Sequence, residues 1–113
     1  MPGITRESVI ETMQEAADRM GLDLEDLQEM INEVLEDCKG KAIRLKDAIM
    51  AADAASIKSI AHDIKGSTAN YGLKTASALA LEIEKNNEKA PLPVVEELIT
   101  LIEDLSKLGL DEG

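Results

Sequence analysis

Three residues near the middle of the chain form a pattern that could support chemistry: His62, Lys65 and Gly66. His62 is the only histidine, Lys65 lies almost one helical turn beyond it, and Gly66 interrupts a run that otherwise favours helix. A neutral imidazole is a nucleophile, and a nearby ammonium can balance the charge of an anionic group bound to it. An interior glycine costs a helix about 1 kcal/mol relative to alanine. We therefore interpret Gly66 as space for another molecule that closely approaches the ring.

Helical geometry predicts the direction in which His62 points. With about 100° of rotation per residue, five mostly apolar residues fall within about 40° of the side opposite the ring. They are Ile57, Ile60, Ile64, Ser67 and Tyr71. We expect that side to face the core and His62 to face outward. The outward neighbours are small or cationic: Ala55, Lys58, Ser59, Lys65, Gly66 and Ala69.

The rest of the sequence excludes most other uses of one histidine. A metal site needs several converging ligands, and the chain has one His and one Cys. Ser67 is expected on the other side of the helix, so it cannot form a nucleophile–base pair with His62. A packed bundle without a Gly-rich loop offers little pocket for a small substrate. The remaining hypothesis is an imidazole that itself carries a group, and a phosphoryl group fits best.

The elements that must position these residues are all predicted to be helices. The chain has no Phe or Trp and one Tyr, so Leu, Ile, Val, Met and Ala must form the core. Apolar residues at helical spacing, together with capping residues and prolines, predict five helices. They cover about 5–20, 23–52, 53–71, 73–85 and 93–105, the second one continuing through Gly40.

Short connections favour an all-α fold, an antiparallel four-helix bundle with a short extra N-terminal helix across one end. We expect a single domain over residues 1–113, with the core bundle at about 23–108 and a frayed tail at Asp111–Gly113.

Charge and cysteine content limit the partners and the compartment. A net charge of −11 makes nucleic acid and anionic membrane surfaces poor partners. The single cysteine, Cys38, cannot form an intramolecular disulfide, which suits a reducing compartment, and its apolar neighbours predict burial. The N-terminus lacks a signal-peptide pattern, and no apolar run is long enough to span a membrane. We expect a cytoplasmic protein.

The stretch "AHDIKGSTANYG" resembles the central motif of the histidine phosphotransfer (HPt) domains. That motif has a His, then Lys-Gly-Ser three residues later, and a Gly ten residues after the His. His62, Lys65, Gly66, Ser67 and Gly72 match it. The family also has a Glu or Gln twenty-two residues after the His, where this chain has Glu84, and Asp53 matches the helix cap upstream.

The resemblance implies that His62 accepts phosphate from the aspartyl phosphate of a receiver domain and passes it to another receiver. Lys65 would neutralise the phosphoryl group, Gly66 would admit the receiver, and Glu84 would fix the ring tautomer. Ala55, Lys58, Ser59 and Ala69 would line the docking surface. The resemblance implies a phosphocarrier without an independent catalytic site and without a cofactor of its own, the receiver supplying Mg²⁺.

Two alternatives remain open. The chain could be the phosphoacceptor domain of a hybrid or chemotaxis-type histidine kinase, which makes such a kinase a second candidate partner. It could also be a non-catalytic helical adaptor that binds receiver domains, with His62 incidental. Because the sequence starts at Met1 and ends soon after the last predicted helix, we expect a free-standing protein, and we expect a monomer.

Overall fold

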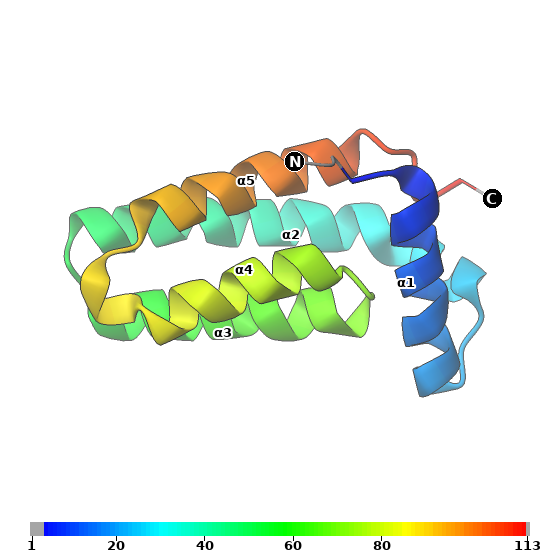
Figure 1. Ribbon diagram of the computed structural model, residues 1–113, viewed down its shortest axis with the longest axis horizontal. Helices are drawn as coiled ribbons and strands as arrows, with labels where there is room; N and C mark the ends of the chain where they lie inside the picture. The colour runs from blue at the N-terminus through cyan, green and yellow to red at the C-terminus, as the bar shows by residue number, and fades with distance from the viewer. Residues whose placement is uncertain (1–3, 113) are drawn as a thin grey trace.

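The computed structural model describes residues 4–112 and shows a bundle of α-helices. Helices α2 (Leu24–Met50), α3 (Ala54–Asn70), α4 (Lys74–Lys85) and α5 (Leu92–Ser106) run alternately in opposite directions along the long axis. Helix α1 (Arg6–Met20) lies across the end at which α2 begins (Figure 1). A short 3₁₀ turn, η1 (Asn87–Lys89), connects α4 to α5. The predicted four-helix bundle with an extra N-terminal helix is confirmed; positions 1–3 and 113 of the predicted domain lie outside the described residues.

The helices begin and end where the capping residues predict. Thr5 and Ser8 bond reciprocally at the start of α1, and Gly21 ends this helix with a left-handed backbone (φ 70°). The Asp53 side chain accepts a hydrogen bond from the Ser56 N–H at the start of α3. Helix α2 is continuous through Gly40, as predicted, and its 27 residues span the length of the bundle.

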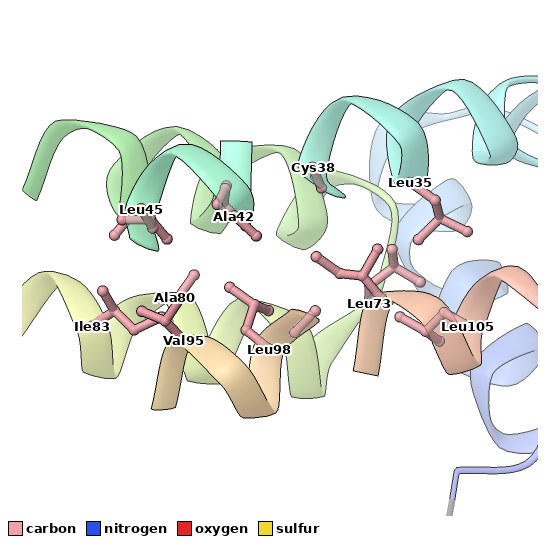
Figure 2. Close-up of a cluster of buried hydrophobic side chains, with 14 of the residues drawn as sticks. Leu35, Cys38, Ala42, Leu45, Leu73, Ala80, Ile83, Val95, Leu98 and Leu105 are labelled. Atoms are coloured by element: carbon pink, nitrogen blue, oxygen red, sulfur yellow. The ribbon is translucent and has the colours of Figure 1, made fainter. Parts of the chain in front are cut away.

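The core is aliphatic throughout. Side chains from α2 face those from α4 and α5 across the bundle axis, with the small Ala42 and Ala80 among larger residues (Figure 2). Leu45, Leu98 and Ile102 are completely buried. Truncating one such side chain to alanine costs about 2–5 kcal/mol, so this packing fixes the relative positions of the helices.

Burial of Cys38 makes its thiol inert. Cys38 has no exposed surface, and desolvation, assisted by the nearby Asp37 carboxylate, raises the pKa of the thiol to about 11. At about pH 8 we therefore expect alkylation by iodoacetamide to be at least about a hundredfold slower in the native protein than in denaturant. Mass spectrometry over time measures this ratio. Rapid native labelling would contradict the buried position.

Two details differ from the sequence-based expectations. The core side of α3 is rotated toward α4: Ala61 and Thr68 are fully buried, whereas Ser67 is only half-buried. Burial of Thr68 is tolerated because its hydroxyl donates to the Ile64 carbonyl at 2.7 Å. The predicted frayed tail is wrong for Glu112, because the Glu112 carbonyl accepts hydrogen bonds from the side chains of Gln28 and Arg6.

The turn between α3 and α4 is seated directly on α1. Gly72 has a left-handed backbone (φ 73°), and a Cβ atom at this position would lie 2.2 Å from the Thr12 carbonyl oxygen. Beside it, the half-buried Tyr71 directs its hydroxyl to the Met30 sulfur of α2 at 3.7 Å. This junction joins α1 to the end of the bundle and sets the angle at which α3 leads into α4.

Candidate functional site

Helix α3 presents His62 to solvent at mid-helix. The His62 side chain is 63% exposed, whereas Ile57 and Ile64 on the same helix are buried. The 100° step of a helix therefore placed the ring correctly. His62 lies in the middle of α3, and the buried residues of this helix fix its backbone within the bundle.

Glu84 of α4 holds both His62 and Lys65. Its Oε2 lies 3.0 Å from His62 Nδ1, and its Oε1 accepts a hydrogen bond from Lys65 Nζ at 2.8 Å. Helices α3 and α4 pack against each other, and each buries a small residue, Ala61 and Ala80 respectively. The structure thus brings His62 and Lys65 together on the Glu84 carboxylate, which are three of the four predicted central residues.

The Glu84 carboxyl is ionised at neutral pH. The hydrogen bond from Lys65 chiefly lowers its pKa, and the one from His62 adds to this, while partial burial opposes both. The stabilisation from these contacts is therefore present above the ordinary glutamate pKa and is lost as the pH falls through the lowered value.

This charge state determines which ring nitrogen is available. A carboxylate can only accept hydrogen bonds, so the contact with Glu84 requires a proton on Nδ1 of His62. In the neutral ring, Nε2 then keeps its lone pair. Because the ring is mostly exposed, this nucleophilic nitrogen is accessible from solvent.

Gly66 leaves space beside the ring that the fold itself does not need. A Cβ at Gly66 would have no heavy atom within 4 Å, and its φ is not in the left-handed region. Neither packing nor backbone conformation requires a glycine here, although glycine weakens a helix. The predicted docking residues are exposed along the same helix: Ala55, Lys58, Ser59 and Ala69.

The sequence did not reveal the ion pair between Lys65 and Glu84. Lys65 was expected to serve an incoming phosphoryl group, yet its ammonium is bound to Glu84 in the isolated protein. The contact joins residues 19 positions apart on different helices. Ser77 could have indicated this contact, because it lies two turns before Glu84 and so on the same side of α4. Its hydroxyl donates to the Lys65 carbonyl, which shows that this side of α4 faces α3.

Within residues 4–112 we also looked for cavities, metal sites and membrane-spanning helices. A mostly apolar cavity of about 260 Å³ opens between α1, α4 and α5, lined in part by Val9, Leu73 and Leu105. Within residues 4–112, no cluster of His, Cys, Asp and Glu side chains is suited to bind a metal ion. None of the helices in that range is long and apolar enough to cross a membrane.

Comparison with protein families gives the observation that decides the classification. The sequence model of the Hpt domain matches residues 6–108, from the start of α1 to just beyond α5. The chain belongs to the Hpt domain family. Hpt domains act in phosphotransfer within phosphorelays, where they interact with receiver domains. No curated protein and no solved structure gives a significant match.

Proposed function

We propose that this Hpt domain is a carrier that accepts a phosphoryl group on Nε2 of His62 and transfers it to a second receiver. The observation that supports this is the exposed ring with Nδ1 bound to Glu84. One contact directs the ring and leaves the nucleophilic nitrogen facing solvent.

The proposed transfer needs no proton exchange with solvent. The Nε2 lone pair attacks the phosphorus of the aspartyl phosphate while the bond from phosphorus to the aspartyl oxygen breaks. The carboxylate leaves with the bonding electrons, and Nδ1 keeps its proton because Glu84 accepts it in a hydrogen bond. The second transfer reverses these changes on another aspartate.

Lys65 and the partner would supply the positive charge. The Lys65 ammonium binds the same Glu84 carboxylate that contacts the ring. From that position the ammonium can turn toward a phosphoryl group on Nε2. We propose that Mg²⁺ is part of the receiver and that this chain contributes no cofactor. The receiver would lie on Gly66 and on the small residues Ala55, Ser59 and Ala69, with Lys58 at the edge.

A panel of radiolabelled, phosphorylated receivers tests this function. We expect at least one to pass its label rapidly to the protein, giving an acid-labile and base-stable phosphate typical of phosphohistidine. Labelling only by ATP with a kinase domain would instead identify a kinase phosphoacceptor domain. Receiver binding without any labelling would identify an adaptor.

Gly66 gives a prediction with a built-in control. Gly66→Gln adds a side chain beside the ring, so we expect phosphotransfer to slow at least about tenfold. The same change should raise the free energy of unfolding by up to about 1 kcal/mol, because glycine is the weaker helix former. Phosphotransfer kinetics and urea denaturation measure the two effects.

Gly40→Gln is the matched control. Gly40 is also exposed, within a helix, and without a heavy atom near its Cβ position, but it lies on α2. We expect the same gain in stability with an unchanged transfer rate. Equal slowing in both variants, or a loss of stability that parallels the slowing at Gly66, would contradict a docking role.

Replacement of Glu84 separates its two contacts. Glu84→Gln keeps an oxygen that can accept from Nδ1 but removes the charge that binds Lys65, so we expect about tenfold slower transfer. Glu84→Ala loses both contacts, and we expect about a hundredfold slower transfer. Nitrogen NMR of the imidazole should show a mixed tautomer population only in the alanine variant.

The control for these variants is Glu82→Gln. Glu82 lies on the same helix, its side chain is exposed, and it forms no ion pair within the described residues. This change should affect neither the rate nor the tautomer. A Glu84→Ala variant with the wild-type tautomer and rate would show that the carboxylate does not position the ring.

A further inference from the structure

Two residues of α4 make all the side-chain hydrogen bonds between α3 and α4 within residues 4–112. The two helices lie side by side (Figure 1). One of the two residues is Glu84, which binds the side chains of His62 and Lys65. The other is Ser77, whose hydroxyl donates to the backbone carbonyl of Lys65 at 3.3 Å. Lys65 is therefore bound to α4 through both its main chain and its side chain.

The bond from Ser77 differs from the bonds of other hydroxyls in these helices. A serine or threonine hydroxyl in a helix can donate to a carbonyl one turn earlier in the same helix. Thr12, Thr68 and Ser106 all do so. Ser77 is half-buried and donates to α3 instead, to an oxygen that the Thr68 hydroxyl also reaches, at 3.2 Å. The Ser77 hydroxyl thus links two helices, where the others bond within one.

The short side chain of Ser77 suits it to fix the register of α4 against α3. Ser77 and Glu84 are seven residues apart, so they lie on the same side of α4 and about 10 Å apart along its axis. The long side chains of Lys65 and Glu84 can keep their ion pair through small shifts of one helix along the other, by changing rotamers. A hydroxyl one carbon from the backbone cannot follow such a shift. The Ser77 bond therefore limits how far α4 can slide or turn relative to α3.

We propose that Ser77 is a positioning residue for phosphotransfer, whose hydroxyl holds α4 where the Glu84 carboxylate meets Nδ1 of His62. The inference rests on the proposed function and adds to it a residue that acts through Glu84. Without the hydroxyl, α4 can shift and the bond from Nδ1 to the carboxylate weakens. The ring then also populates the tautomer in which Nε2 carries the proton and is not a nucleophile. Transfer slows, although the outward side of α3 is unchanged.

Three variants of Ser77 isolate the hydroxyl. Ser77→Thr keeps it, Ser77→Val has nearly the same shape as the threonine but lacks it, and Ser77→Ala removes it without adding bulk. We expect the threonine variant to keep the wild-type kcat within about twofold, and the other two to lose at least about threefold, with KM unchanged. Nitrogen NMR of the unphosphorylated protein should show a mixed tautomer population of His62 in the valine and alanine variants only. Circular dichroism checks that each variant is folded.

Ser106→Val is the matched control, because it removes a hydroxyl whose bond stays within α5. This variant should keep the wild-type tautomer and kcat. In a Glu84→Ala background, Ser77→Val should slow transfer no further, because its effect passes through that carboxylate.

Two results would overturn the positioning role of Ser77. One is the wild-type tautomer in both Ser77→Ala and Ser77→Val, and the other is equal slowing by Ser77→Val with and without the Glu84 carboxylate. The NMR measurement needs no receiver. If the wild-type protein accepts phosphate from no receiver, the proposed function fails, while the tautomer still decides whether Ser77 positions Glu84 on the ring.

Discussion

A His62→Gln variant will accept no phosphoryl group from a phosphorylated receiver, while its helix content stays that of the wild-type protein. Glutamine has no nucleophilic nitrogen, so the expected loss is complete rather than partial. The fold should tolerate the change because the ring is 63% exposed and, within residues 4–112, its side-chain polar contact is with Glu84 alone. Radiolabel transfer and circular dichroism measure the two outcomes.

Asp63→Asn provides the control for the loss of His62. Asp63 is the next residue on α3, is exposed, and forms no ion pair within residues 4–112. This variant should still be labelled, which shows that disturbing this part of the helix is not enough to stop transfer. An acid-labile, base-stable phosphate on the glutamine variant would place the acceptor elsewhere and refute the assignment of His62.

Gly72→Ala should be among the most destabilising single substitutions in the protein. The new Cβ would lie 2.2 Å from the Thr12 carbonyl oxygen and 2.8 Å from the Met13 Cα, both part of the α1 backbone. Backbone atoms cannot rotate away as a side chain does, so α1 must shift. The left-handed φ of 73° adds about 1–2 kcal/mol of strain for alanine.

Together the overlap and the strain should lower the free energy of unfolding by about 2–5 kcal/mol. A shift of α1 would also disturb Met13, Ala16 and Ala17, which are completely buried. Since small domains have only about 5–15 kcal/mol of stability, this is a large share. Urea denaturation gives the value.

Gly21→Ala separates strain from overlap. Gly21 also has a left-handed backbone (φ 70°), but its Cβ position has no heavy atom within 4 Å. We expect a loss of about 1–2 kcal/mol there, from backbone strain alone. If both variants lose the same stability, the contact between Gly72 and α1 contributes nothing.

Features encoded over a few neighbouring residues could be predicted from the sequence. The start of α1 at Thr5 and of α3 at Asp53 follows from local hydrogen bonds between side chains and the first helical turn. The outward direction of His62 follows from the helical repeat. The contact of Glu84 with the ring was expected from the resemblance to the HPt family, and in the structure its carboxylate lies within hydrogen-bond distance of His62 Nδ1.

Features that depend on packing between distant segments could not be predicted in this way. The core side of α3 includes Ala61 and Thr68 rather than Ser67, because α4 covers that edge. The position of Gly72 was expected from its turn, but its contact with α1 exists only in three dimensions. The binding of Lys65 to Glu84 likewise depends on the register of α3 against α4.

The lone phenol, at the turn between α3 and α4, has a practical optical consequence. Without tryptophan, the chain absorbs and emits ultraviolet light almost only through Tyr71, whose hydroxyl lies against the Met30 sulfur. Fluorescence excited at wavelengths longer than the tyrosine absorption band would come wholly from a tryptophan-containing partner. Complex formation can then be followed through the partner's own emission, without attaching a dye to either protein.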